Sequence, residues 1–141
     1  MPNESKMLCL TSACLLGLCT RYDGRTRESP EALEMLTRLH AVPVPICPEQ
    51  LGGLSTPRPP AILWGGDGFA VLDGRARVLD IHGRDLSAAF IRGADQALAI
   101  ARMLDIRIAC LKSGSPSCGG PPRFGVTAAL LVRAGLEVRF F

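Results

Sequence analysis

Short apolar segments of strand length alternate along this chain with segments of helical apolar spacing, and this alternation limits the fold more than any other feature. The strand-like segments are residues 7–13, 41–46 and 106–111. Apolar runs of this length suit strands that are buried on both faces, as in parallel sheets covered by helices. The sequence therefore predicts a layered α/β domain of the doubly wound type with mainly parallel strands.

The segments between these strands carry signals for helices. Ser29 is a suitable cap and Pro30 a suitable first helical residue, and leucines spaced by three residues then give one apolar stripe. Asp85 can cap a second helix, although Gly93 weakens it, and Gly135 can end a third. The predicted helices span residues 29–40, 85–104 and 126–134, and a last strand spans 136–141.

Asp73 and Gly74 form a dipeptide that is typical of a tight hairpin turn, because both central positions of such a turn take positive φ. Segments that favour strands flank this dipeptide at residues 69–72 and 75–81. We therefore predict a β-hairpin that is inserted beside the main sheet.

The composition fits one globular domain. The chain has 141 residues, the usual size of a domain, and we expect a single domain over residues 1–141. Hydrophobic residues make up 48% of the chain, yet no stretch approaches the roughly 20 apolar residues of a membrane span. The net charge is only +3 and the arginines are scattered, which disfavours a protein that reads duplex nucleic acid.

The N-terminal segment superficially resembles a signal peptide, because one lysine precedes an apolar run. The run continues into Gly17, Cys19 and Arg21 without a small-residue cleavage site, so a core strand and its loop explain it better. We therefore expect a cytoplasmic protein with no membrane partner.

Six cysteines in a cytoplasmic chain are a poor match for a disulfide framework, because thiols there are kept reduced. Cys14, Cys47 and Cys118 each lie at or shortly after the end of a predicted strand. Ligands of such sheets bind beyond the carboxyl ends of the strands, where the loops meet. The predicted topology therefore brings these three cysteines to one site.

The other cysteines have simpler interpretations. Cys9 and Cys110 lie inside apolar strands and are expected to be small core residues, while Cys19 stays open as a further ligand. A structural zinc site is disfavoured, because the chain lacks a C-x₂-C pair. A phosphatase-like thiol nucleophile is also disfavoured, since six residues separate Cys14 from Arg21, one more than in a C-x₅-R loop.

Three thiolates suit an iron–sulfur cluster in which one iron lacks a protein ligand. Such an iron is a Lewis acid that can bind a substrate sulfur and polarise its bond to carbon. The spacing alone leaves the alternative that the three cysteines are merely buried or incidental.

Five motifs decide between these hypotheses, because they occur in an order that resembles the thiouracil desulfurase family. The resemblance covers nearly the whole chain, and three of the motifs carry Cys14, Cys47 and Cys118. The motifs are SACLLGLCTRYDG at residues 12–24, CPEQLGGLSTPRPP at 47–60, GRDLSAAFIRGA at 83–94, LKSGSPSCG at 111–119 and GVTAALL at 125–131.

The resemblance implies a Rossmann-like, three-layer domain with a [4Fe-4S] cluster on three cysteines, which correspond to Cys14, Cys47 and Cys118. It also implies an enzyme that removes sulfur from a small thiolated base such as 2-thiouracil without redox chemistry. Uracil and hydrogen sulfide would be the products.

Glu49, two residues after Cys47, is the best candidate for handling protons on the water or the ring nitrogen. Ser117 and Ser12 are candidate hydrogen-bond donors beside two of the cysteines. Arg58 has two interpretations, a structural role or a contact with an anionic part of a ligand.

The chain departs from the family pattern after Cys118, where the short segment 119–125 joins directly to the last predicted helix. We expect this loop to border the site and to affect the choice of substrate. If it alters the pocket, the alternative function is a non-catalytic sensor or sulfur carrier that binds a cluster or a metal. The segment 59–62 also lacks an acidic residue that is frequent in the family.

Overall fold

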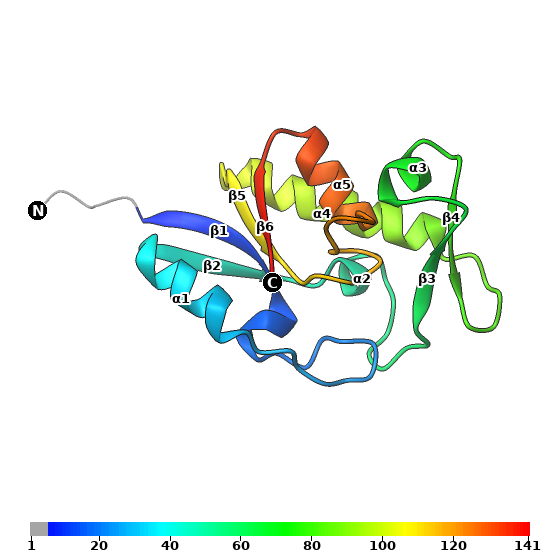
Figure 1. Cartoon of the computed structure of the whole chain (residues 1–141), viewed down its shortest axis with the longest axis horizontal. Coiled ribbons are helices and arrows are strands. Elements are labelled where there is room, and N and C mark those ends of the chain that lie inside the picture. Colours follow the sequence, from blue (N-terminus) through cyan, green and yellow to red (C-terminus); the bar gives the residue numbers. More distant parts are fainter. Residues whose placement is uncertain (1–5) are drawn as a thin grey trace, which may run out of the picture.

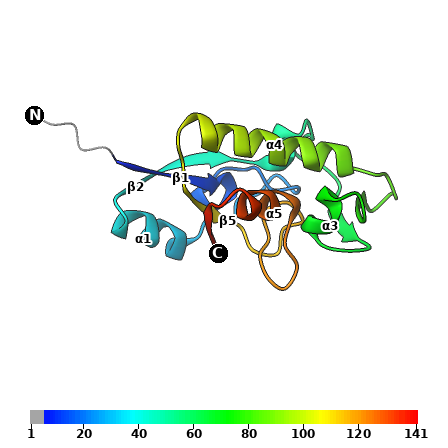
Figure 2. The same ribbon diagram turned by 90° about the horizontal axis from the view of Figure 1, so that it is seen from above.

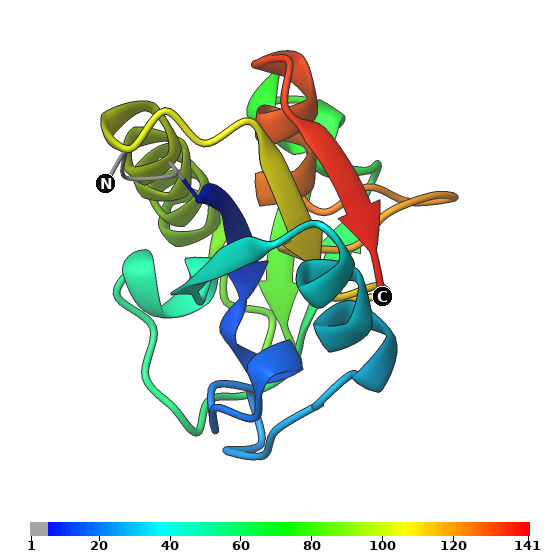
Figure 3. The ribbon, with the colours of Figure 1, turned by 90° about the vertical axis from the view of Figure 1, so that its left-hand side faces the viewer.

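Parallel strands form the central sheet of the computed structural model, which describes residues 6–141 (Figure 1). Residues 1–5 of the predicted domain lie outside the described residues. Figure 3 shows the strands side by side in the order β2-β1-β5-β6, and each neighbouring pair is parallel. The strands are β1 (Met7–Ser12), β2 (Ala41–Ile46), β5 (Ile108–Leu111) and β6 (Glu137–Phe140). The predicted parallel sheet is confirmed.

The edge position of β2 explains how this strand tolerates prolines. Pro43 and Pro45 lack the N–H group that a central strand would donate to its neighbours. Because β2 pairs only with β1, the missing N–H groups remove no hydrogen bonds to a second neighbouring strand. The prolines therefore fit this strand although they would not fit a central one.

Helices cover both faces of the sheet (Figure 2). α4 (Ser87–Met103) and α5 (Val126–Arg133) pack on one face, and α1 (Pro30–Arg38) packs on the other. Alternate residues of a strand pack against the helices on opposite sides of the sheet, because successive side chains point to opposite faces. Leu10 and Ala109 join the core under α4 and α5, whereas Cys9 and Cys110 join the core under α1. The predicted three-layer arrangement is confirmed.

The helix signals in the sequence are mostly correct. The Ser29 hydroxyl accepts the Ala32 N–H group at 3.1 Å, and Pro30 is the first residue of α1. α4 begins at Ser87, two residues after the predicted cap, and Asp85 accepts the Ser87 N–H group at 2.9 Å. Within residues 6–141, no helix has both the length and the apolar character needed to cross a bilayer.

The inserted antiparallel pair is present, but its predicted first strand was wrong. β3 (Ala61–Trp64) pairs with β4 (Arg77–Asp80), while the segment predicted as a strand at 69–72 belongs to the helix α3 (Gly68–Leu72). The Asp67 carboxylate caps this helix by accepting the Ala70 N–H group at 3.0 Å. Helical spacing also buries both Ala70 and Val71, which a strand would send to opposite faces.

Two short helical turns follow strands of the main sheet and were absent from the sequence prediction. The 3₁₀ turn η1 (Ala13–Leu16) follows β1, and α2 (Pro48–Leu51) follows β2. Each spans only four residues, too few to show a helical apolar period. Cys14 lies within η1 and Cys47 caps α2, so both turns fix the direction in which a cysteine leaves the sheet.

Glycines allow α2 to lie directly against α4. A Cβ atom at Gly93 of α4 would overlap the carbonyl oxygen of Pro48, and one at Gly52 would overlap the carbonyl oxygen of Ala89. Gly93 lowers the helix propensity of α4, but this close backbone contact requires a glycine there. The contact sets the position of the chain that follows Cys47.

We predict that Gly93→Ala destabilises the protein by about 1–3 kcal/mol, because the added methyl group forces α2 away from α4. The same substitution in an exposed helix would stabilise it by about 1 kcal/mol. Urea unfolding monitored by circular dichroism measures the difference. Asp95→Ala on the exposed side of α4 is the control and is expected to change stability by less than about 0.5 kcal/mol. A stabilised Gly93→Ala variant would contradict the proposed contact.

Candidate functional site

A cavity of about 340 Å³ opens at the carboxyl ends of β1, β2 and β5. The structure brings Cys14, Cys47 and Cys118 together in its wall, although they come from distant parts of the sequence. The other polar or charged residues of the wall are Ser12, Thr20, Arg21, Tyr22, Arg27, Glu49, Arg58, Lys112, Ser113, Ser115 and Ser117.

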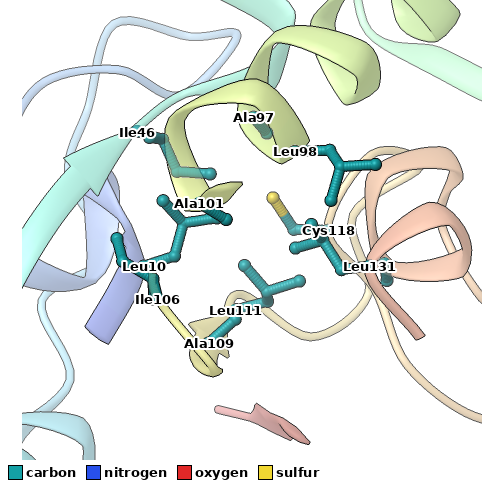
Figure 4. Close-up of a cluster of buried hydrophobic side chains, with 11 residues drawn as sticks. Leu10, Ile46, Ala97, Leu98, Ala101, Ile106, Ala109, Leu111, Cys118 and Leu131 are labelled. Atoms are coloured by element: carbon teal, nitrogen blue, oxygen red, sulfur yellow. The ribbon is translucent and has the colours of Figure 1, made fainter. Parts of the chain in front are cut away.

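The three cysteines differ in exposure. Cys14 and Cys118 are buried, with 8% and 4% of their surface exposed, and Cys47 is half-buried. Figure 4 shows the Cys118 sulfur among the apolar side chains of the core, near Leu98 and Leu131. Cys118 therefore lies at the boundary between the core and the cavity.

Burial keeps two of these thiols protonated at neutral pH. Desolvation raises the pKa of Cys118 to about 12, while the neighbouring hydroxyl groups of Ser12 and Ser117 act in the opposite direction. Desolvation also raises the pKa of Cys14, while the nearby Lys112 ammonium acts in the opposite direction. Cys47 adds to the rise at both thiols, because like charges repel within one site.

Glu49 lies in the cavity wall with both carboxylate oxygens held. Arg58 Nε lies 2.9 Å from Glu49 Oε1, and the Ser117 hydroxyl donates to Glu49 Oε2 at 2.8 Å. The ion pair is largely shielded from water, since the side chains of Arg58 and Glu49 are 6% and 13% exposed. Two of the predicted site residues, Glu49 and Ser117, are thus in direct contact.

Arg58 lines the cavity and has a structural role in its wall. Its guanidinium also donates to the Thr20 carbonyl oxygen at 3.0 Å and to the Thr56 hydroxyl at 2.7 Å. One of its nitrogens lies 3.9 Å from the Cys47 sulfur. These contacts tie the first loop and the segment after α2 to the carboxylate of Glu49. No motif in the sequence indicates this network, because its members lie far apart along the chain.

Ser12 and Ser115 order the backbone around Cys118. The Ser12 hydroxyl accepts the Lys112 N–H group at 2.9 Å, which joins the ends of β1 and β5. The Ser115 hydroxyl accepts the Cys118 N–H group at 3.1 Å and lies 2.9 Å from the Ser117 hydroxyl. Ser115 was not among the predicted site residues, although it belongs to the same serine-rich motif.

Positive charge surrounds the cavity. Arg21, Arg27 and Lys112 line it, and burial together with the charge of Arg27 lowers the pKa of Lys112. The Arg21 Nε group is buried without a hydrogen-bond partner, and it lies 3.4 Å from the Asp23 carboxylate. An anionic group of thiolates would be stabilised in this setting.

The remaining cysteines lie elsewhere. Cys19 is exposed and does not line the cavity, which removes it as a further ligand in this arrangement. Cys9 and Cys110 are fully buried core residues, as predicted. Among the described residues 6–141, no three histidine, cysteine or acidic side chains are grouped closely enough to hold a single metal ion.

The short loop 119–125 does not border the cavity, contrary to expectation, since the lining ends at Cys118. The loop instead packs toward the inserted strands. The Arg123 guanidinium donates to the carbonyl oxygens of Leu63 and Gly66, at 3.1 and 2.9 Å. Pro60 and Ala61, from the segment without the acidic residue, do line the cavity and give it an apolar side.

Comparisons with known proteins agree with this geometry. The chain is 38% identical to the protein YbbK of Bacillus subtilis (strain 168), over 92% of each sequence. Its structure matches that of the [4Fe-4S]-dependent thiouracil desulfidase TudS with a TM-score of 0.75 and 37% identity, over 97% of this chain and 91% of the other. The family model of 2-thiouracil desulfurase matches residues 9–139. The chain therefore belongs to the 2-thiouracil desulfurase family of enzymes.

Proposed function

We propose that this protein removes sulfur from thiolated nucleobases such as 2-thiouracil, in a non-redox reaction that depends on a [4Fe-4S] cluster held by Cys14, Cys47 and Cys118. The oxo base and hydrogen sulfide are the products. The convergence of three cysteines and Glu49 in one cavity is the observation that carries the proposal. The similarity to TudS, a [4Fe-4S]-dependent thiouracil desulfidase, supports the choice of cofactor and substrate.

The donor set of the cavity fits such a cluster. The wall offers three thiols, and the nearby arginines and Lys112 suit the negative charge of a cluster bound to three thiolates. Binding of iron replaces the protons that burial otherwise keeps on Cys14 and Cys118. When bound, the cluster supplies a Lewis-acidic iron without a protein ligand.

Glu49 is the group that we expect to handle protons during the exchange of sulfur for oxygen. Replacing C=S by C=O consumes one water and releases hydrogen sulfide, so protons move while no electrons are transferred. Each carboxylate oxygen of Glu49 keeps a lone pair beyond its contact with Arg58 or Ser117, and can accept a proton from the attacking water. Arg58 and Ser117 hold the carboxylate in place during this step.

The alternative of a non-catalytic sensor or sulfur carrier depends on a pocket that is altered by the loop 119–125. That loop does not line the cavity. No contact in the site therefore favours this alternative over the enzyme.

The direct test is an anaerobic assay. The purified protein is reconstituted with iron and sulfide and incubated with 2-thiouracil, and uracil and sulfide are measured together. We expect both products in equal amounts, without an added reductant or oxidant. Release of neither product from a cluster-loaded protein would overturn the proposed function.

Alanine substitution of each proposed ligand tests the cluster site. Cys14→Ala, Cys47→Ala and Cys118→Ala are each expected to lose most of the broad visible absorption and the bound iron, because two thiolates hold a cluster poorly. Cys19→Ser, which removes an exposed thiol outside the cavity, is the matched control and should retain both. Full iron content in all three alanine variants would exclude this ligand set.

Substitution of Glu49 separates proton handling from cluster binding. Glu49→Gln keeps the size of the side chain, and we expect normal visible absorption with a kcat lowered by about 10²–10⁴-fold. The control, Glu34→Gln on the exposed side of α1, should leave kcat unchanged. A Glu49→Gln variant with wild-type kcat would show that another group moves the proton.

A further inference from the structure

Two further thiols form a pair inside the sheet, apart from the three cysteines of the cavity. Cys9 on β1 and Cys110 on β5 are both fully buried, and their sulfur atoms are 3.0 Å apart. The two strands are neighbours in the sheet, and neither cysteine lines the cavity. The site described above leaves this pair without a role.

The register of the strands explains why the two side chains meet. Cys110 lies opposite Thr11, two residues along β1 from Cys9, so both cysteines point to the same face of the sheet. This face is covered by Met35 and Leu36 of α1. A disulfide has a sulfur–sulfur distance of about 2.0 Å, so the two sulfur atoms must approach each other by about 1 Å to form one.

The contact between the two thiols favours Cys9 over Cys110 as the one that loses its proton first. The hydrogen bond from the Cys110 thiol lowers the pKa of Cys9, and the same contact raises that of Cys110. Arg139 lies opposite Cys110 on β6, with one guanidinium nitrogen 3.9 Å from the Met35 sulfur. This cation lies on the same face of the sheet as the two thiols.

We propose that Cys9 and Cys110 are a redox-active dithiol, which a peroxide converts into a disulfide between β1 and β5. In the first step the Cys9 sulfur attacks the O–O bond of hydrogen peroxide, giving a sulfenic acid and water. In the second step the Cys110 sulfur displaces the hydroxyl group, which leaves as a second water. Two thiols are oxidised and one peroxide is reduced.

Access to the pair requires only a local opening. α1 has nine residues and rests on the sheet through Ala32, Met35 and Leu36. A helix this short with few buried contacts can open without unfolding the sheet beneath it. A small oxidant such as hydrogen peroxide then reaches the thiols.

The disulfide would stabilise the sheet if the cavity at the strand ends loses the proposed cluster. It closes a loop of 101 residues between strands whose ends carry Cys14 and the loop to Cys118. Crosslinks across long loops restrict the unfolded chain most strongly. Oxidation of Cys9 and Cys110 would therefore stabilise the folded chain after the cavity cysteines have lost the proposed cluster.

Peroxide treatment of the intact, anaerobically prepared protein tests this inference. After treatment, free thiols are alkylated under denaturing conditions and the protein is digested with trypsin. Cys110 then lies in the fragment 108–112, which has no other cysteine, and Cys9 lies in the fragment 7–21. We expect these fragments to be linked, with tandem mass spectrometry placing the bridge at Cys9, and a melting temperature raised by about 5 °C or more.

Cys9→Ala should leave Cys110 free to be alkylated after the same treatment, whereas the control Cys19→Ser should still form the bridge. The wild-type digest decides the question even if Cys9→Ala folds poorly. A fully alkylated Cys110 at a peroxide dose that oxidises Cys19, or a bridge from Cys110 to another cysteine, would overturn the inference. A lowered melting temperature of the bridged protein would overturn the stabilising role.

Discussion

The parallel alignment of β1, β2 and β5 is the constraint on which the rest of the molecule depends. Parallel strands must all end at the same edge of a sheet, so the three segments that follow them meet there. Helices on both faces bury the strands and leave that edge as the place where the chain can present polar groups. The cavity and its cysteines follow from this arrangement, since Cys14, Cys47 and Cys118 all come after strands of one direction.

A second level of organisation fixes the loops around the cavity. The carboxylate of Glu49 binds Arg58 on one oxygen and Ser117 on the other, so three separate segments share one anchor. The backbone contact between α2 and α4, which only glycines allow, sets the position of this anchor. The position of the Glu49 carboxylate and the position of Cys47 therefore depend on the same few residues.

The sequence predicted the sheet and the larger helices well, because apolar period and caps are local signals that Ser29 and Pro30 illustrate. It failed at residues 69–72, where four apolar residues fit a strand or a helix, and only the Asp67 cap favours the helix. The convergence of the cysteines followed from topology, whereas the contacts of Arg58 and the pairing of Cys9 with Cys110 depend on side chains brought together from distant segments. A pattern of neighbouring residues in the sequence does not predict such contacts.

We propose that Cys14, Cys47 and Cys118 hold one iron–sulfur cluster in this cavity. A crystal structure of the anaerobically prepared protein, with anomalous diffraction data collected at the iron absorption edge, tests it most directly. We expect one compact group of iron peaks inside the cavity, bonded to all three cysteine sulfurs. Iron peaks at other residues, or a cavity without iron peaks in crystals that contain iron, would contradict this ligand set.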